Sequence, residues 1–114
     1  MSERVLPLFT LWETTLKDLL PRTARFPKSV RFTFSGRIDN LALDVFERLV
    51  EARYERKAGS ALRAASLDLE KLRLLLRVCH DLAYLDHRGY EHVARNLDEA
   101  GRMIGGWIKQ QDRA

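Results

Sequence analysis

The sequence predicts an all-α, antiparallel four-helix bundle of up-down-up-down topology that works by binding. Apolar residues recur at three- and four-residue spacing through four segments of the 114-residue chain. Glycine and proline are few (6 and 3), and the connections between the segments are short. Helices joined by short connections pack most simply as antiparallel neighbours. A chain of this length makes one domain, which we expect to span residues 1–114.

The first helix is expected over residues 7–20. Its inward stripe falls on one face of a helix: Leu8, Leu11, Trp12, Thr15, Leu16 and Leu19. Pro7 suits the first turn of a helix. Pro21 is expected to stop the helix, because proline has no N–H group to donate to the preceding turn.

The second helix is expected to start after Phe26-Pro27 and to reach about residue 57. Its main stripe is Phe34, Ile38, Leu41, Val45, Leu49 and Ala52. Residues 30–34 alternate like a strand, but we predict helix here because a single strand would have no partner. Gly36 weakens this helix by about 1 kcal/mol relative to alanine. Gly59-Ser60 is expected to end it.

The third helix is expected over residues 61–85 and carries two apolar faces. One is a seam of alternating four- and three-residue steps: Ala65, Leu69, Leu72, Leu76, Cys79 and Ala83. The other lies nearly opposite: Leu67, Leu74, Val78 and Leu85. A helix in a single four-helix bundle needs one apolar stripe, so the second face predicts contact with another subunit.

The fourth helix is expected over residues 88–111. Its apolar residues follow a heptad pattern: Tyr90, Val93, Leu97, Ala100 and Ile104, followed by Trp107 or Ile108. Trp12 and Trp107 are expected to be core or interface aromatics. Gly101 and Gly105 lie four residues apart and would let a neighbouring helix approach closely.

Composition limits the class of protein. The chain has 20 Lys and Arg against 16 Asp and Glu, a net charge of +4, and arginine suits phosphate and carboxylate groups. No apolar run approaches the ~20 residues of a membrane span. The N-terminal residues do not resemble a signal peptide. The single cysteine, Cys79, has apolar neighbours and predicts a buried thiol in a reducing compartment. We therefore expect a cytoplasmic protein with no membrane contact.

Three groups of cations are candidate contacts for nucleic acid or a partner. On the third helix, one sector holds Arg73, Arg77, His80 and Tyr84, bordered by Glu70 and Asp81. On the fourth, a line at seven-residue intervals holds Arg88, Arg95, Arg102 and Lys109. The acid-free segment from residue 22 to 38 holds Arg22, Arg25, Lys28, Arg31 and Arg37. Guanidinium groups reach phosphates, and an aromatic ring stacks on a base.

The alternative for both helical groups is an ordinary solvated face. The acids that border the sector of the third helix would then pair with its arginines. Asp98 lies three residues after Arg95 and four before Arg102, so we expect it to neutralise part of the line on the fourth helix.

The other titratable clusters predict no catalytic or metal site. An acidic stripe runs along the second helix: Asp44, Glu47, Glu51 and Glu55. A di-iron bundle needs Glu-x-x-His motifs, and no glutamate here has a histidine three residues later. His80, His87 and His92, with Cys79, show no tetrahedral ligand spacing. No phosphate loop, nucleophile elbow or triad is present. We expect no enzyme activity, no metal and no cofactor.

Several runs resemble those of a known family. They are Leu67-Asp68-Leu69-Glu70-Lys71-Leu72, His80-Asp81-Leu82-Ala83-Tyr84-Leu85 and Glu99-Ala100-Gly101-Arg102-Met103-Ile104-Gly105-Gly106-Trp107-Ile108. They resemble the four-helix bundle proteins that include those encoded by intervening sequences in bacterial 23S ribosomal RNA genes. Within this group the chain is similar in particular to Avd, the accessory variability determinant of diversity-generating retroelements. That likeness is carried by Leu72-Arg73-Leu74-Leu75-Leu76-Arg77, by Phe26-Pro27-Lys28 and by the terminal helix with its tryptophan.

The resemblance implies a homopentameric, positively charged barrel without catalytic activity of its own. Avd-like proteins bind the reverse transcriptase of the retroelement and nucleic acid, RNA or cDNA, and support error-prone copying of template RNA. The alternative is an RNA-binding or interaction module of the intervening-sequence type, without a reverse transcriptase partner. A reverse transcriptase in the adjacent gene would separate the two. A third hypothesis, a small hydrolase or metal-dependent enzyme, lacks the site chemistry.

Overall fold

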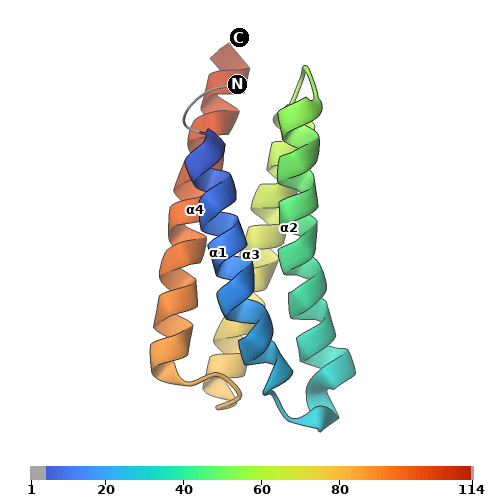
Figure 1. The fold of residues 1–114 in the computed structure, drawn as a ribbon, viewed down its shortest axis with the longest axis vertical. Helices are drawn as coiled ribbons and strands as arrows, with labels where there is room; N and C mark the ends of the chain where they lie inside the picture. Colours follow the sequence, from blue (N-terminus) through green and yellow to red (C-terminus); the bar gives the residue numbers. More distant parts are fainter. Residues whose placement is uncertain (1–4, 114) are drawn as a thin grey trace.

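The computed structural model describes residues 5–113 and is built from four antiparallel helices (Figure 1). These are α1 (Val5–Ala24), α2 (Gly36–Tyr54), α3 (Gly59–Asp81) and α4 (His87–Arg113). Helix α1 packs against α2 and α4, and α3 packs against the same two helices, which is the up-down-up-down arrangement. No residue between 5 and 113 lies in a strand. The all-α fold is therefore confirmed. Within this range, no helix is long and apolar enough to cross a membrane.

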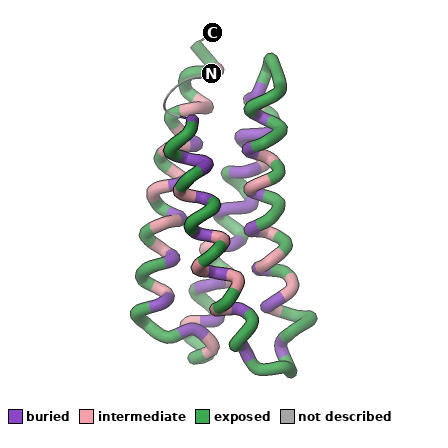
Figure 2. The backbone as a smooth tube through the Cα atoms, in the orientation of Figure 1, coloured by how far each residue is buried: buried purple, intermediate pink, exposed green. Residues whose placement is uncertain are grey.

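The buried residues follow the inner faces of the four helices (Figure 2). Trp12, Ile38, Leu72 and Ile104 are fully buried, and each belongs to the apolar stripe expected for its helix. Polar contacts also cross between helices. The Trp12 indole Nε1 donates a hydrogen bond to the Ala42 carbonyl oxygen at 2.9 Å. The Arg48 guanidinium lies 3.6 Å from the carboxylate of Asp68, which is itself buried. The core is thus apolar, with a few polar links between neighbouring helices.

Helix α1 does not stop at Pro21, contrary to expectation. It continues to Ala24, with Pro21 inside the helix. The missing N–H removes one hydrogen bond of the last turn only. The Thr23 hydroxyl, which gives its one hydrogen to the nearer Asp39 carboxylate, also lies 3.1 Å from the Leu20 carbonyl oxygen. A proline in the last turn of a helix is tolerated because its missing N–H removes only one hydrogen bond there.

The connection between α1 and α2 is helical but irregular. A 3-10 turn spans Lys28–Val30 and a π-helical turn spans Arg31–Ser35, so the expected single helix from residue 28 is divided. Residues 30–34 therefore form no strand, despite their alternating sequence. Gly36 donates its N–H to the Arg31 carbonyl, and a Cβ at this glycine would lie 3.3 Å from that oxygen. Glycine therefore suits the step from the π turn into α2.

Two other helix ends differ from the sequence expectation. Gly59-Ser60 begins α3 rather than ending the second helix, since α2 already ends at Tyr54. Helix α3 ends at Asp81 because Ala83 takes a left-handed φ of 63°, and the Tyr84 N–H bonds the Cys79 carbonyl at 2.9 Å. This is the geometry that closes many helices, with alanine in the place that glycine usually takes. As a result Ala83 is exposed and Leu85 is buried, the reverse of their expected places.

Candidate functional site

The arginine sector of α3 is partly neutralised by acids. Arg73 is hydrogen-bonded to Asp98 of α4 and lies 3.7 Å from Glu70 of its own helix. The expectation that Asp98 serves the cations of α4 is therefore wrong: its partner lies on the neighbouring helix. Arg77, one turn further along α3, is exposed and makes no ion pair with any residue between 5 and 113. Only one of the two arginines thus keeps an uncompensated charge.

The line of cations along α4 is exposed but also carries acids beside it. Arg95 lies 3.6 Å from Glu91, and Arg102 is hydrogen-bonded to Glu99. The two ends of the line, Arg88 and Lys109, are exposed and pair with no acid in the described part of the chain. The line exists as expected, with its two middle members compensated by intrahelical partners.

His80 belongs to a cluster that joins α3 to α4. Its ring stacks on Tyr90, with centroids 4.4 Å apart and planes at 13°. Its Nε2 lies 3.2 Å from Nδ1 of His87, whose other nitrogen lies 2.9 Å from the Glu91 carboxylate. His80 is thus engaged within the protein.

Tyr84 does not share the arginine sector, so that part of the sequence interpretation is wrong. Because α3 ends at Asp81, the chain turns and places the Tyr84 ring against Phe26 and Phe34, each at 6.1 Å between centroids. Tyr84 therefore packs between the two connections at one end of the bundle. The cause, the left-handed Ala83, has no signal in the sequence, because alanine rarely adopts this conformation.

The third group of cations lies at the same end of the bundle, from the last turn of α1 (Arg22) through the connection to the first turn of α2 (Arg37) (Figure 1). Arg22 is bound to Asp18 at 3.0 Å, and this hydrogen bond raises the pKa of the guanidinium above its ordinary value. Arg25, Lys28 and Arg31 differ from it. All three are exposed, and none forms an ion pair with a residue in the range 5–113. This connection therefore presents three uncompensated positive charges close together in the chain.

Phe32 stands among these cations and was not identified as a site residue from the sequence. Its side chain is 89% exposed. It borders a hollow of about 470 Å³ that is also lined by Lys28, Arg31 and Asp39. An aromatic residue within an acid-free, cation-rich segment is the signal that could have identified it.

The carboxyl group in this hollow is turned toward α1. Asp39 accepts a hydrogen bond of 2.6 Å from the Thr23 hydroxyl. Burial raises the pKa of the Asp39 carboxyl above its ordinary value, and the hydrogen bond from Thr23 opposes this effect. Asp39 makes no ion pair with the described cations around it, so it leaves Lys28 and Arg31 uncompensated.

The second apolar face of α3 lies on the outside of the bundle, as expected. Leu67, Leu74 and Val78 are 57%, 53% and 42% exposed, and we call these three residues the outer face of α3. Beside them, a shallow groove between α2 and α3 is lined by Leu41 and Leu75. The outer face is therefore a surface of apolar side chains without a partner inside the bundle.

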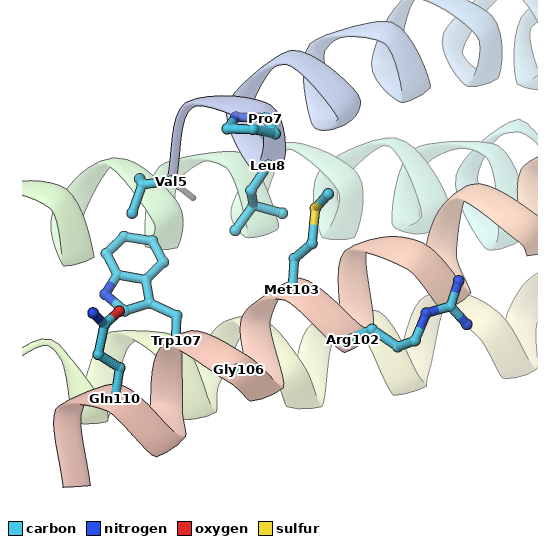
Figure 3. Close-up of a pocket in the computed structure, with 8 residues that line it drawn as sticks. All are labelled: Val5, Pro7, Leu8, Arg102, Met103, Gly106, Trp107 and Gln110. Carbon is cyan, nitrogen blue, oxygen red and sulfur yellow. The ribbon is translucent and has the colours of Figure 1, made fainter. Parts of the chain in front are cut away.

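A separate apolar groove of about 330 Å³ lies between the start of α1 and the end of α4 (Figure 3). Leu8, Met103 and Trp107 line it, with Arg102 at its edge. Trp107 is half-buried here, whereas Trp12 lies in the core. The expectation that the two tryptophans are core or interface residues agrees with these positions.

The remaining titratable groups are dispersed. The acidic stripe of α2 faces solvent: Asp44, Glu47, Glu51 and Glu55. Between residues 5 and 113, no three His, Cys, Asp or Glu side chains gather as metal ligands would. Burial raises the pKa of the Cys79 thiol to about 11, so this thiol stays protonated at neutral pH.

Comparison with known proteins assigns the chain to a family. The sequence has no significant match among curated proteins. A family model described as bAvd-like, however, matches residues 10–111 and so reaches from α1 to α4. The chain belongs to the bAvd-like family.

Proposed function

We propose that the protein is a non-catalytic accessory subunit of a diversity-generating retroelement. In this role it binds the reverse transcriptase and nucleic acid and supports mutagenic copying of template RNA into cDNA. The observation that carries the proposal is the family match over residues 10–111. The chemistry of copying then belongs to the polymerase, and the bundle supplies binding surfaces.

The uncompensated cations support the nucleic-acid part of the proposal. Arg25, Lys28 and Arg31 at one end of the bundle, and Arg77 on α3, have no acidic partner between residues 5 and 113. A cation already paired with a carboxylate gains little from a phosphate, whereas an unpaired one releases condensed counterions from the nucleic acid. These four side chains, together with Arg88 and Lys109 of α4, which also lack an acidic partner in the described chain, are therefore the expected phosphate contacts.

The outer face of α3 supports assembly from several copies, and family resemblance makes a homopentamer the expected state. Light scattering at micromolar concentration measures the mass directly. Leu74→Glu should dissociate the assembly and keep its helix content, because Leu74 is exposed in the single bundle. Ser66→Glu, also exposed on α3 but outside the outer face, is the matched control and should leave the mass unchanged. A wild-type protein near 13.3 kDa would contradict assembly.

Reconstitution with the reverse transcriptase of the same retroelement tests the function itself. The protein should co-purify with the polymerase and increase cDNA synthesis on template RNA, and it should show no turnover alone with metals, nucleotides or nucleic acid. Retained RNA binding without polymerase binding would favour the intervening-sequence type of module. Turnover that disappears with a single Glu or His substitution would contradict a non-catalytic role.

A further inference from the structure

We propose that Phe32 is a stacking platform for an unpaired base of a single-stranded nucleic acid, with Lys28 and Arg31 contacting the flanking phosphates. This inference rests on the proposed nucleic-acid binding and adds the residue and the form of nucleic acid that it recognises.

The exposure of Phe32 is unusual for its residue type. At 89% it is the most exposed of the large apolar side chains between residues 5 and 113. The residues around it are anchored: Val30 and Ser35 are buried, and Phe34 packs against Tyr84. The π turn from Arg31 to Ser35 therefore holds the backbone in place while the Phe32 ring faces outward. Such turns are rare and occur frequently at functional sites.

The charges around the ring favour a polyanion. Arg25, Lys28 and Arg31 precede Phe32 in the chain, Arg37 follows it, and no acid occurs from residue 22 to 38. Proteins that hold single strands combine such cations, which follow the phosphates, with aromatic rings on which bases stack. Every base has a flat face, so this contact tolerates any sequence. In a duplex the bases are already stacked on each other and their faces are not available to the ring.

The hollow beside Phe32 determines how the base and the phosphates of a bound strand are oriented. Asp39 lines this hollow. Its carboxylate would repel a phosphate there and would accept a hydrogen bond from an N–H group of a base. Lys28 and Arg31 line the same hollow. The base is therefore expected to point into the hollow over the Phe32 ring, with its phosphates on the two cations.

Tyr54 provides a comparison within the same chain. It is 80% exposed, close to the value for Phe32, but it lies next to the other end of the bundle, beside the turn from α2 to α3. The Arg53 guanidinium lies 5.9 Å from its ring centroid, and Glu51 and Glu55 are its acidic neighbours in the chain. Arg56 and Lys57 follow in the same segment, so Tyr54 stands among charges of both signs, whereas Phe32 stands in an acid-free segment. Tyr54 is thus the matched control for an exposed ring.

The experiment measures binding of a fluorescently labelled single-stranded RNA to the full chain by anisotropy. Phe32→Ala should weaken binding by about 5- to 150-fold, the range for loss of one stacked base, without changing the dependence on salt. Phe32→Trp should bind as tightly as wild type, because it keeps an aromatic ring. Phe32→Leu, which is apolar but has no π face, should bind as weakly as Phe32→Ala. Tyr54→Ala should bind as wild type does. The effect of Phe32→Ala should disappear on a strand of abasic residues, which keeps the phosphates and lacks the bases.

Several outcomes would overturn the inference. Equal weakening on the abasic strand, or full rescue by Phe32→Leu, would show that the ring does not act by stacking. If Phe32→Ala loses polymerase binding but keeps its RNA affinity, the ring contacts the polymerase. If the oligomeric mass of this variant changes, the ring contacts a second copy of the chain. If wild type binds RNA and Phe32→Ala binds equally well, the inference fails and the proposed function stands. If wild type binds no nucleic acid, the proposed function fails as well.

Discussion

Three of the cations on α3 and α4 look like those of the α1–α2 connection in the sequence but differ from them in the structure. On the helices, Arg73, Arg95 and Arg102 each have a carboxylate partner, either one helical turn away or on the neighbouring helix. On the connection, the three exposed cations between Ala24 and Phe32 have none in the described chain. A helix brings residues three and four apart together, so a cation on a mixed helical face meets acids there. An irregular, acid-free connection offers no such partner.

The largest effect is expected from removing one whole group of cations at a time. The triple variant Arg25→Ala, Lys28→Ala, Arg31→Ala should reduce the log–log salt slope for single-stranded RNA by about 2.1 per engaged subunit, because each lost phosphate contact removes about 0.7. The matched triple Arg73→Ala, Arg95→Ala, Arg102→Ala should change it less. Anisotropy titrations at several salt concentrations measure both slopes, and circular dichroism checks that helix content is kept. An equal or larger change in the helical triple would reverse the comparison.

A smaller effect should follow from freeing a cation that is now paired. Asp98→Asn removes the charge that neutralises Arg73, so the salt slope should become steeper by up to about 0.7 per engaged subunit. The free energy of unfolding should fall by only about 0.2–1 kcal/mol, as for other exposed pairs. Salt titration and urea denaturation measure the two quantities. An unchanged slope would mean that Glu70 alone holds Arg73 or that no phosphate reaches it.

The smallest effect concerns the one acid in the hollow of the α1–α2 connection. Burial raises the folded-state pKa of Asp39, so the folded protein binds a proton more readily than the unfolded chain does. Stability from this group is therefore present at low pH and is lost as pH rises from the ordinary carboxyl pKa through the raised one. Asp39→Asn should thus gain more thermal stability relative to wild type at pH 7 than at pH 3. A difference that does not vary with pH would contradict this assignment.

The sequence was sufficient for the regular parts of the fold. Heptad and 3.6-residue patterns placed Trp12, Ile38, Leu72 and Ile104 in the core, because periodicity reports directly on which face is buried. The ends of helices were less predictable. Helix α1 continues past Pro21 because the missing N–H removes only one hydrogen bond in the last turn, and Ala83 closes α3 in a conformation that alanine seldom takes. Such local contacts depend on tertiary structure, and single-residue preferences do not report them.

The candidate site was predictable to a lesser degree for a related reason. Spacing along one helix assigned Asp98 to the cations of α4, whereas its partner Arg73 comes from α3, across the helix interface. Tyr84 lies outside the arginine sector of α3 because this helix ends at Asp81, one turn earlier than expected. The acid-free segment from residue 22 to 38 was visible as a charge pattern, but the exposure of Phe32 was not, since an alternating apolar pattern normally indicates burial.

The hydrogen bond of the Trp12 indole restricts how the helices of the bundle align along one another. Heptad stripes are nearly repetitive, so two helices can slide by one repeat and still bury apolar residues against each other. Such a slide would carry the buried Nε1 away from the Ala42 carbonyl and leave a donor without an acceptor, at a cost of about 1–3 kcal/mol. The Arg48–Asp68 ion pair, at 3.6 Å and without a hydrogen bond, adds a weaker preference for this alignment between α2 and α3. These two polar links select one register among several, and they set where the α1–α2 connection stands at the end of the bundle.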